Sequence, residues 1–441
     1  MKRAALHNLG CKVNAYEAQS MEEMLLEAGY EIVDFENDVA DVYIVNTCSV
    51  TNIADRKSRQ MLHKAKKKNP DAIVVAAGCY VQAAADDVLS DSAVDIVIGN
   101  NKKIDLVRIL DEFWDRKNEE KRSNVIDINH TDEYEELEIE TVSEHTRAYI
   151  KVQDGCNQFC TYCIIPYTRG RIRSRRMDAV IDEVKRLAEN GYKEVVLTGI
   201  HLSSYGLDMP KDDRVLLIEL IEEVSKVSGI ERIRLGSLEP RIVTEEFAKR
   251  LAGVHKICPH FHLSLQSGCD ATLKRMNRKY NTAEYEKGCK ILREAFENPA
   301  ITTDVIVGFP QETDDEFKET VAFLKKIHFF EMHIFKYSRR KGTVADKMEG
   351  QVHDQVKNER SDVLIKLEEE MSNEYRMSLV GKKCAVLFEE TVTIEGEEYF
   401  IGHTDTYVKV AVRTHENLEN KILLVNVKEV LGRDIILGEI S

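Results

Sequence analysis

Three cysteines lie on one short segment of the chain, with the spacing Cys156-x3-Cys160-x2-Cys163. Thiolates are the ligands of iron–sulfur clusters, and three of them on a tight loop can hold three irons of a [4Fe–4S] cube. Because no fourth cysteine is close in sequence, the fourth iron would stay open to a bound substrate, as in a catalytic metal site. The alternatives are a zinc site that lacks a ligand and three ordinary core cysteines. The close spacing favours the cluster.

A second set of three cysteines is dispersed, and its spacing matches no short metal-binding motif. Cys11, Cys48 and Cys79 each follow directly on a segment predicted to be a parallel strand. The carboxyl ends of parallel strands open into one crevice, so the three thiols can converge there. Two interpretations stay open, a second cluster with an open iron and three half-buried thiols at strand ends. The remaining cysteines share no spacing and are predicted to be inert buried thiols: Cys258, Cys269, Cys289 and Cys384.

Alternating strands and helices are predicted to position both sets. Residues 1–115 predict an α/β domain with a parallel sheet, and the acidic residues 116–144 predict a solvated linker. Residues 145–375 repeat a strand–helix unit about six times and predict a partial (β/α)6 barrel. The Cys156 loop follows its first strand, at the end where such folds place their chemistry. Residues 376–441 predict a small all-β barrel of five short strands.

The whole chain has the composition of a soluble globular protein. Its 441 residues are 43% hydrophobic and 32% charged, with a formal net charge of −15. No apolar run reaches the ~18 residues of a membrane span, and the N-terminus turns polar too early for a signal peptide. We therefore expect a cytoplasmic protein without a membrane segment, where disulfides are disfavoured. The acidic balance excludes indiscriminate coating of nucleic acid but allows a local basic site.

These segments together resemble one known family over essentially the whole chain. The Cys156–Cys163 loop resembles the radical S-adenosylmethionine (SAM) motif, and its continuation through Arg175 is similar to that of the methylthiotransferases. The segments around Cys11, Cys48 and Cys79 resemble the N-terminal domain of that family, and residues 376–441 resemble an RNA-binding TRAM domain. The resemblance implies the three-domain order predicted above.

Three branches of this family act on different substrates: threonylcarbamoyladenosine in tRNA, isopentenyladenosine in tRNA, and an aspartate of a ribosomal protein. The segments 10–14, 198–202 and 262–268 resemble the first branch most. The resemblance therefore implies conversion of N6-threonylcarbamoyladenosine (t6A) at position 37 of tRNA to its 2-methylthio derivative. The other two substrates stay as alternatives, and so does an RNA-binding iron–sulfur sensor without turnover.

The resemblance also implies two [4Fe–4S] clusters and two uses of SAM. The Cys156/Cys160/Cys163 cluster would cleave one SAM to a 5′-deoxyadenosyl radical that removes hydrogen from adenine C2. The cluster of the dispersed set would present the sulfur, and a second SAM would supply the methyl group. An aromatic C–H has no acidic proton, so a cofactor must lower the barrier. The implied partners are tRNA, an electron donor such as flavodoxin or ferredoxin and a sulfur source, and we expect a monomer.

Residues at the ends of the other barrel strands are predicted to bind SAM. A carboxylate such as Glu239 at a barrel mouth seldom serves packing, and it suits a ribose. Each of these positions is also compatible with an ordinary turn or strand end. The full set is Thr198, Gly199, Ser237, Glu239, Gln266, Ser267 and Gly308.

Arginines follow the cysteine loop, with five guanidinium groups within eight residues. The planar fork of Arg suits phosphate, so Arg169, Arg171, Arg173 and Arg175 are predicted to contact the RNA backbone or to hold a carboxylate of the substrate or of SAM. The alternative is a solvated helix entry. Residues 376–441 carry 8 Lys and Arg against 11 Asp and Glu, so RNA binding there requires a local cationic face that includes Lys409. Aromatic residues of that region fit base stacking or a barrel core.

Overall fold

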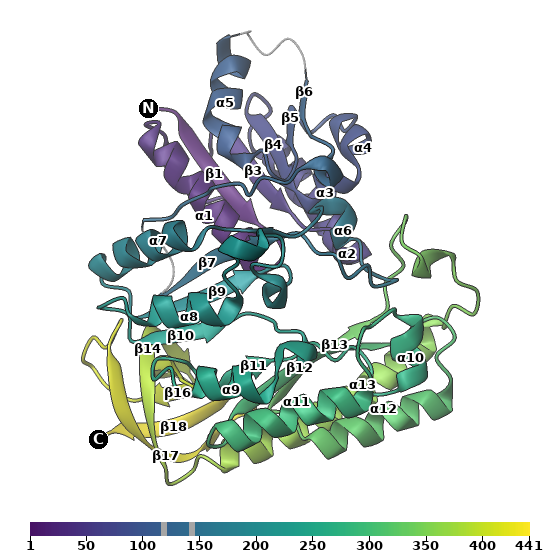
Figure 1. The fold of residues 1–441 in the computed structure, drawn as a ribbon. Coiled ribbons are helices and arrows are strands. Elements are labelled where there is room, and N and C mark those ends of the chain that lie inside the picture. Colours follow the sequence, from purple (N-terminus) through teal and green to yellow (C-terminus); the bar gives the residue numbers. More distant parts are fainter. Residues whose placement is uncertain (116–120, 141–145) are drawn as a thin grey trace.

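The computed structural model describes residues 1–115, 121–140 and 146–441. Three domains follow one another along the chain, coloured from purple to yellow in Figure 1: an α/β domain, a partial barrel and a small β-barrel. The fold class predicted from the sequence is confirmed. Within the described residues, no helix is long and apolar enough to cross a membrane.

The N-terminal domain is a six-stranded parallel sheet with the order β2-β1-β3-β4-β5-β6. Helices α1 and α5 pack on one face, and α2, α3 and α4 pack on the other. Strands buried on both faces become continuous apolar runs, as the fully buried β3 and β4 show. The strands are β1 (Arg3–Asn8), β2 (Glu31–Ile32), β3 (Val42–Thr47), β4 (Ile73–Gly78), β5 (Ile96–Ile98) and β6 (Arg122–Asn124). The helices are α1 (Lys12–Glu27), α2 (Asn52–Lys68), α3 (Cys79–Ala83), α4 (Ala85–Leu89) and α5 (Leu106–Asp115).

The central domain has six parallel strands, which form an open barrel in chain order. One sheet has the order β10-β9-β7-β8, the other β11-β12-β13, and parallel bridges join them at Ile233–Ile257 and Leu238–Leu263. In the described part of the chain β7 and β13 are not paired, and α1 of the N-terminal domain packs against β7. The strands are β7 (Arg147–Asp154), β8 (Arg173–Ser174), β9 (Glu194–Gly199), β10 (Arg232–Leu235), β11 (His260–His262), β12 (Ala300–Val307) and β13 (Glu331–Lys336). The helices are α6 (Ile165–Thr168), α7 (Met177–Glu189), α8 (Leu217–Ser225), α9 (Glu245–Ala252), α10 (Asp270–Arg275), α11 (Thr282–Ala295) and α12 (Asp314–Ile327).

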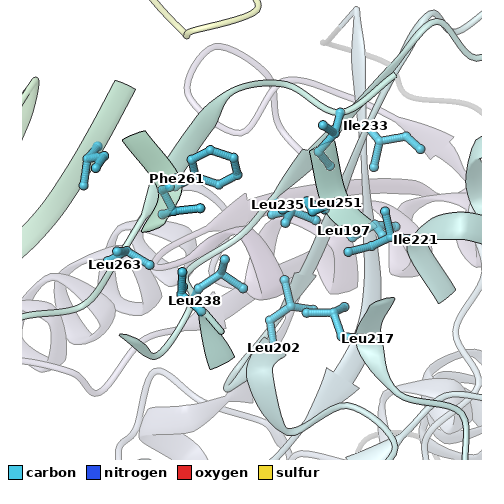
Figure 2. Close-up of a cluster of buried hydrophobic side chains, with 14 of the residues drawn as sticks. Leu197, Leu202, Leu217, Ile221, Ile233, Leu235, Leu238, Leu251, Phe261 and Leu263 are labelled. Atoms are coloured by element: carbon cyan, nitrogen blue, oxygen red, sulfur yellow. The ribbon is translucent and has the colours of Figure 1, made fainter. Parts of the chain in front are cut away.

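An apolar core joins the barrel strands to the surrounding helices. Figure 2 shows its side chains, which come from strands and helices alike. Ile233 and Leu235 of β10 belong to this core together with Ile221 of α8. Because successive strand residues point to opposite faces, the residues between these apolar ones are left for the barrel interior.

The C-terminal domain is a closed barrel with the order β14-β15-β16-β18-β17. Helix α13 (Asp354–Met377) leads into it. The barrel packs on the starting ends of the central strands, where Arg232 donates to the carbonyl oxygens of Ala385 and His403 at 2.7 and 3.0 Å. The strands are β14 (Lys383–Ile394), β15 (Glu397–Thr404), β16 (Lys409–Val412), β17 (Ile422–Leu431) and β18 (Ile435–Ile440).

The prediction of a solvated linker was wrong for the part of it that is described. β6 extends the N-terminal sheet as its sixth strand, and Leu137 and Ile139 are buried in the core of the central domain. The acidic side chains find cationic partners, since Arg175 Nε lies 2.8 Å from a carboxylate oxygen of Glu136. The prediction relied on the many acidic residues of this segment and did not weigh the apolar residues that alternate with them. Residues 116–120 and 141–144 of the predicted linker lie outside the described residues.

Candidate metal centres

The Cys156 loop leaves the carboxyl end of β7 and leads into α6. Gly155 must turn the chain at φ +70°, and a Cβ atom there would lie only 1.8 Å from the carbonyl oxygen of Arg171. The segment after α10 holds the loop: Asn277 Nδ2 donates to the Phe159 carbonyl at 2.9 Å, and Thr161 N to that of Met276 at 3.0 Å. The loop is therefore fixed by glycine geometry and by contacts from a distant part of the barrel.

The three thiols of this loop lie close enough to influence one another electrostatically. Burial raises the pKa of Cys156 to about 11 and that of Cys163 to about 12, and the neighbouring Cys160 adds to both shifts. Arg278 Nη1 points at Cys160 Sγ from 3.2 Å. As free thiols, Cys156 and Cys163 stay protonated at neutral pH, and a bound metal would favour their thiolates.

The structure brings the dispersed cysteines together at the carboxyl ends of β1, β3 and β4. A Cβ atom on Gly10 would lie 3.1 Å from Cys48 Sγ. Burial raises the pKa of Cys48 to about 11, and the nearby Cys79 and Cys11 add to the shift. Cys48 and Cys79 are buried, whereas Cys11 is exposed. Gly78, at φ +96°, leaves no room for a side chain, because a Cβ atom would lie 2.6 Å from Asn46 Oδ1.

Both triplets fit a cluster of several irons better than a single metal ion. The ligands of one ion surround it closely, and within the described residues only His262, Asp304 and His333 place three such atoms all within 4.8 Å of one another. In a cube each thiolate binds a different iron, so the cysteines stand farther apart. The donor sets therefore fit two [4Fe–4S] clusters, each with three cysteine ligands.

Arg169 reaches from the central domain into the N-terminal cysteine site across the domain interface. It follows the Cys156 loop in the central domain, yet its Nε points at Cys79 Sγ from 3.3 Å. Its other nitrogens donate to Asn14 Oδ1 at 2.7 Å and to Glu17 at 2.7 and 2.9 Å, both on α1. The N-terminal site is thus completed by a side chain of the other domain.

A buried ionic network surrounds Arg169. Although burial acts to raise it, the pKa of Glu17 is held well below its ordinary value by Arg169, Lys103 and Lys151. Asp154 pairs with Lys151 at 3.0 Å and with Arg169 at 3.2 Å, and with Arg173 at 3.8 Å. Glu135 supplies a third negative charge near Lys151. Four cations against three carboxylates leave one positive charge over, and a neighbouring anionic cluster would balance it.

The prediction of RNA contacts was wrong for three of the four arginines. Arg169, Arg173 and Arg175 are fully buried; Arg175 pairs with Glu183 and Arg173 Nη1 donates to the Arg169 carbonyl at 2.9 Å. These three arginines turn inward, toward the carboxylates of Asp154 and Glu183. Arg171 is exposed and lies 4.5 Å from the Phe159 ring centre, so its RNA contact stays a prediction.

The predicted SAM-binding residues divide into two groups. Glu239 is close enough to influence Cys156 and pairs with Arg241 at 2.6 Å. Ser267 was predicted wrongly, because it is fully buried and its hydroxyl lies 3.3 Å from Thr320 Oγ1 on α12. The six residues other than Ser267 end strands or begin loops of the barrel, and their contact with SAM stays a prediction: Thr198, Gly199, Ser237, Glu239, Gln266 and Gly308.

Three residues near the sites were not singled out from the sequence. Arg278 follows α10, more than a hundred residues beyond the cysteine that it faces, and no local motif marks it. Asn100 Nδ2 lies 3.6 Å from Cys79 Sγ. His201 keeps a buried Nε2 without a partner among the described residues, and burial, with Arg278 and Arg241, lowers its pKa to about 4. Only His201 carried a signal, since it belongs to the segment 198–202 at the end of β9.

The C-terminal barrel has fewer aromatic side chains free to stack on RNA bases than its sequence suggested. Tyr407 stacks on His260 and His403 with ring centres 5.0 and 4.7 Å apart, and Arg147 and Arg234 also lie over its ring. It therefore serves the contact between domains rather than base stacking. Lys409 is half-buried at the start of β16, and its RNA contact stays a prediction.

Comparisons with known proteins agree with this architecture. Residues 150–324 match the Radical SAM superfamily, and residues 3–99 match the uncharacterized protein family UPF0004. The threonylcarbamoyladenosine tRNA methylthiotransferase of Bacillus subtilis is 41% identical over 97% of this chain and 94% of its own length. The tRNA-2-methylthio-N(6)-dimethylallyladenosine synthase of Acetivibrio thermocellus is 35% identical over 97% of this chain and 89% of its own.

Solved structures show the same fold at much lower identity. A radical S-adenosylmethionine methyltransferase from Kitasatospora setae, with cobalamin and a [4Fe-4S] cluster bound, superposes with a TM-score of 0.59 and 14% identity. The match covers 78% of this chain and 77% of that one.

Proposed function

The chain belongs to the radical SAM methylthiotransferase family, and we propose that it converts t6A in tRNA to 2-methylthio-t6A. The observation that carries this proposal is that Arg169, which follows the Cys156 loop in the central domain, points at Cys79 and pairs with Glu17, so the segment after one cysteine triplet completes the site of the other. The choice of t6A rests on the relatives, because threonylcarbamoyladenosine enzymes reach 41% identity over nearly the whole chain. The dimethylallyladenosine enzymes reach 35%.

The two triplets would hold the two clusters. Cys156, Cys160 and Cys163 fit the cluster that binds SAM, since Glu239, which follows the end of β10, lies close enough to influence Cys156. Cys11, Cys48 and Cys79 fit the second cluster. When bound, the clusters and SAM supply the radical chemistry that replaces the adenine C2 hydrogen with a methylthio group.

The protein's own residues donate hydrogen bonds to the cysteine sulfurs and limit the access of water to the interface. Arg278 and Arg169 each direct an N–H at one cysteine sulfur, at 3.2 and 3.3 Å. Hydrogen bonds to cluster sulfurs and the charge around them are what tune the reduction potential. The network around Glu17 is fully buried at the interface, whereas Cys11 is exposed and the three loop cysteines are partly exposed. Low water content strengthens every charge interaction in the sites.

The tRNA substrate is proposed to approach beside the Cys156 loop. Arg171 and Phe159 contact each other there, and the half-exposed Tyr167 lies with its ring centre 5.9 Å from that of Phe159. An arginine beside aromatic rings suits an unstacked base and its phosphate. An electron donor of the flavodoxin or ferredoxin type and a sulfur source complete the proposed partners.

Mass spectrometry of tRNA nucleosides tests the substrate. Deletion of the gene should remove 2-methylthio-t6A and leave t6A in its place, and the purified enzyme should restore it with SAM and a reductant. Unchanged 2-methylthio-t6A would contradict the proposal. Loss of the methylthio derivative of isopentenyladenosine, or of a ribosomal aspartate, would assign the chain to one of the other two branches.

SAM cleavage separates enzyme from sensor. A reduced sample reconstituted with iron and sulfide should hold about eight of each per chain and should form 5′-deoxyadenosine from SAM. A fully loaded sample that forms none would indicate an RNA-binding iron–sulfur protein without turnover.

A further inference from the structure

The interior of the central barrel is lined by charged and imidazole side chains. Where a closed barrel is filled by branched aliphatic residues, here Arg147, Glu194 and Arg234 lie on β7, β9 and β10. His262, Asp304 and His333 continue the lining on β11, β12 and β13. A polar interior of this kind must either satisfy itself or receive a polar guest.

Most of these groups satisfy one another. Arg234 pairs with Glu194 at 2.7 Å, and Arg147 pairs with Glu389 of the C-terminal barrel at 3.2 Å. His262 Nε2 lies 3.2 Å from Asp304, and its Nδ1 lies 3.0 Å from Thr302 Oγ1. Each cation of the strands therefore already has its carboxylate.

Lys12 is the exception. It is the first residue of α1, directly after Cys11, and its side chain is exposed to water. Arg147, Arg234 and Glu194 nevertheless act on it, and it acts in turn on His260 and His333. The ammonium group therefore stands near these side chains of the barrel interior, and α1, which carries it, packs against β7 at the open side of the barrel. No hydrogen bond or ion pair to it is found in the described part of the chain.

The unpaired ammonium group of Lys12 determines which kind of ligand the barrel interior favours. The groups that face Lys12 are two paired arginines, one paired carboxylate, two imidazoles and the Cys11 thiol, so no free carboxylate is left to pair with the ammonium group. A divalent cation among His262, Asp304 and His333 would meet that charge as a repulsion. An anion with hydrogen-bonding groups would be attracted.

Building on the proposed function, we propose that Lys12 binds the carboxylate of the threonylcarbamoyl group of the substrate nucleoside. The imidazole of His333, which Lys12 influences and which stacks on His262, would bond the urea or hydroxyl groups of the same arm. In adenine, N1 lies between C2 and C6, the carbon that carries N6, so a residue that holds the N6 arm on the N1 side lies near the carbon that receives sulfur. Lys12 follows a predicted ligand of the sulfur-bearing cluster, which puts arm and sulfur at one place. A dimethylallyl arm has no charged or hydrogen-bonding group that an ammonium group could bind.

The test couples a change in the protein to a change in the substrate. Anticodon stem-loop RNAs carrying t6A, or its threoninamide analogue without the charge, are bound to wild-type enzyme, Lys12→Met and Lys12→Arg. Wild type should prefer the acid over the amide at least about tenfold, as a charged hydrogen bond allows. Lys12→Met should lose that preference and bind the amide as wild type does, while Lys12→Arg should keep part of it. Lys290→Met on α11, 74% exposed, is the matched control and should keep all of it.

The outcomes separate this inference from the function on which it rests. If the wild-type enzyme does not methylthiolate t6A RNA, the proposed function is wrong. If the wild type does so but Lys12→Met still prefers the acid over the amide, only the role assigned to Lys12 is wrong. Iron content of each variant shows whether the neighbouring cluster survives, and Lys12→Arg carries the test if Lys12→Met loses iron. A stoichiometric divalent ion that disappears in His333→Ala would also overturn the assignment, because that ion would then hold the carboxylate.

Discussion

The two cysteine triplets reach similar donor sets by opposite routes. The first lies within eight residues on one loop, so local sequence brings its thiols together. The second is gathered from three strand ends, with 36 and 30 residues between its members, so only the parallel sheet brings them together. The ligands of a metal site can thus be brought together either by a short sequence motif or by the order of strands in a sheet.

The two triplets also differ in what supports them. Arg278, which points at Cys160, belongs to the same domain as the loop. Arg169, which points at Cys79, crosses from the central domain into the N-terminal one. The dispersed site should therefore depend on domain docking, and the loop site should not. Variants that separate these two dependences test the comparison.

The largest effect is expected from loss of a single ligand. Cys160→Ala and Cys48→Ala should each lower iron from about eight to about four per chain and reduce methylthiolation to background. Cys48→Ala should still form 5′-deoxyadenosine from SAM, whereas Cys160→Ala should not. Cys384→Ala, outside both sites, is the control and should keep its iron. If Cys48→Ala leaves the iron count unchanged, the dispersed triplet holds no cluster.

The next effect concerns the arginine shared between domains. Arg169→Met leaves Glu17 and Asp154 with fewer cations in a buried site, so unfolding free energy should fall by about 3–5 kcal/mol. Iron loss should be selective for the N-terminal site, measured by Mössbauer or EPR spectra of reconstituted protein. Arg176→Met, on an exposed arginine paired with Asp178, should change stability by less than about 0.5 kcal/mol. Equal loss of both clusters in Arg169→Met would remove the distinction between the sites.

A smaller effect is expected from the arginine that serves the loop site alone. Arg278→Gln removes a charged N–H donor from Cys160, and such a bond contributes about 1.5–3 kcal/mol. SAM cleavage should slow by roughly tenfold or more, with a changed EPR signal of that cluster, while the second cluster keeps its spectrum. A changed spectrum of the second cluster instead would place Arg278 at the wrong site.

What the sequence could predict follows the same division. The three-cysteine loop and the alternation of strands and helices are local signals, so the fold class and the loop ligands could be proposed directly. The dispersed cysteines needed the strand order as well as the pattern, since parallel strand ends meet only in the folded sheet. Their assignment as ligands still awaits an iron analysis.

The errors arose where a local pattern is resolved by distant partners. Alternating arginines suggest a phosphate-binding face, but Arg173 and Arg175 are turned inward to Asp154 and Glu183, on β7 and α7. The acidic segment suggests solvent, but its apolar residues complete a core that only the folded chain provides. Arg278 left no local mark, because its partner lies 118 residues away.

The smallest effect is expected at the other domain interface, where no cluster lies. Glu389 on β14 bonds His403 at 2.7 Å and pairs with Arg147 at 3.2 Å. Burial opposes ionisation there, but His403 and Arg147 hold the pKa of Glu389 below its ordinary value of 4.5. A carboxylate of lowered pKa contributes stability that is complete above about pH 4.5 and is lost as the pH falls further. Glu389→Gln should therefore cost about 1–2 kcal/mol at pH 7.

The pH dependence makes this a control for the whole comparison. The difference in unfolding free energy between wild type and Glu389→Gln should shrink as the pH falls from 5 toward 3, since the wild-type carboxylate then takes up its proton. Denaturant titrations across that range, on protein without iron, measure it. At pH 7 the reconstituted variant should keep both clusters, because docking of the C-terminal barrel supports neither triplet. If Glu389→Gln also loses iron from the dispersed site, that site would respond to any destabilisation of the protein. The iron loss in Arg169→Met would then not show a specific role of Arg169.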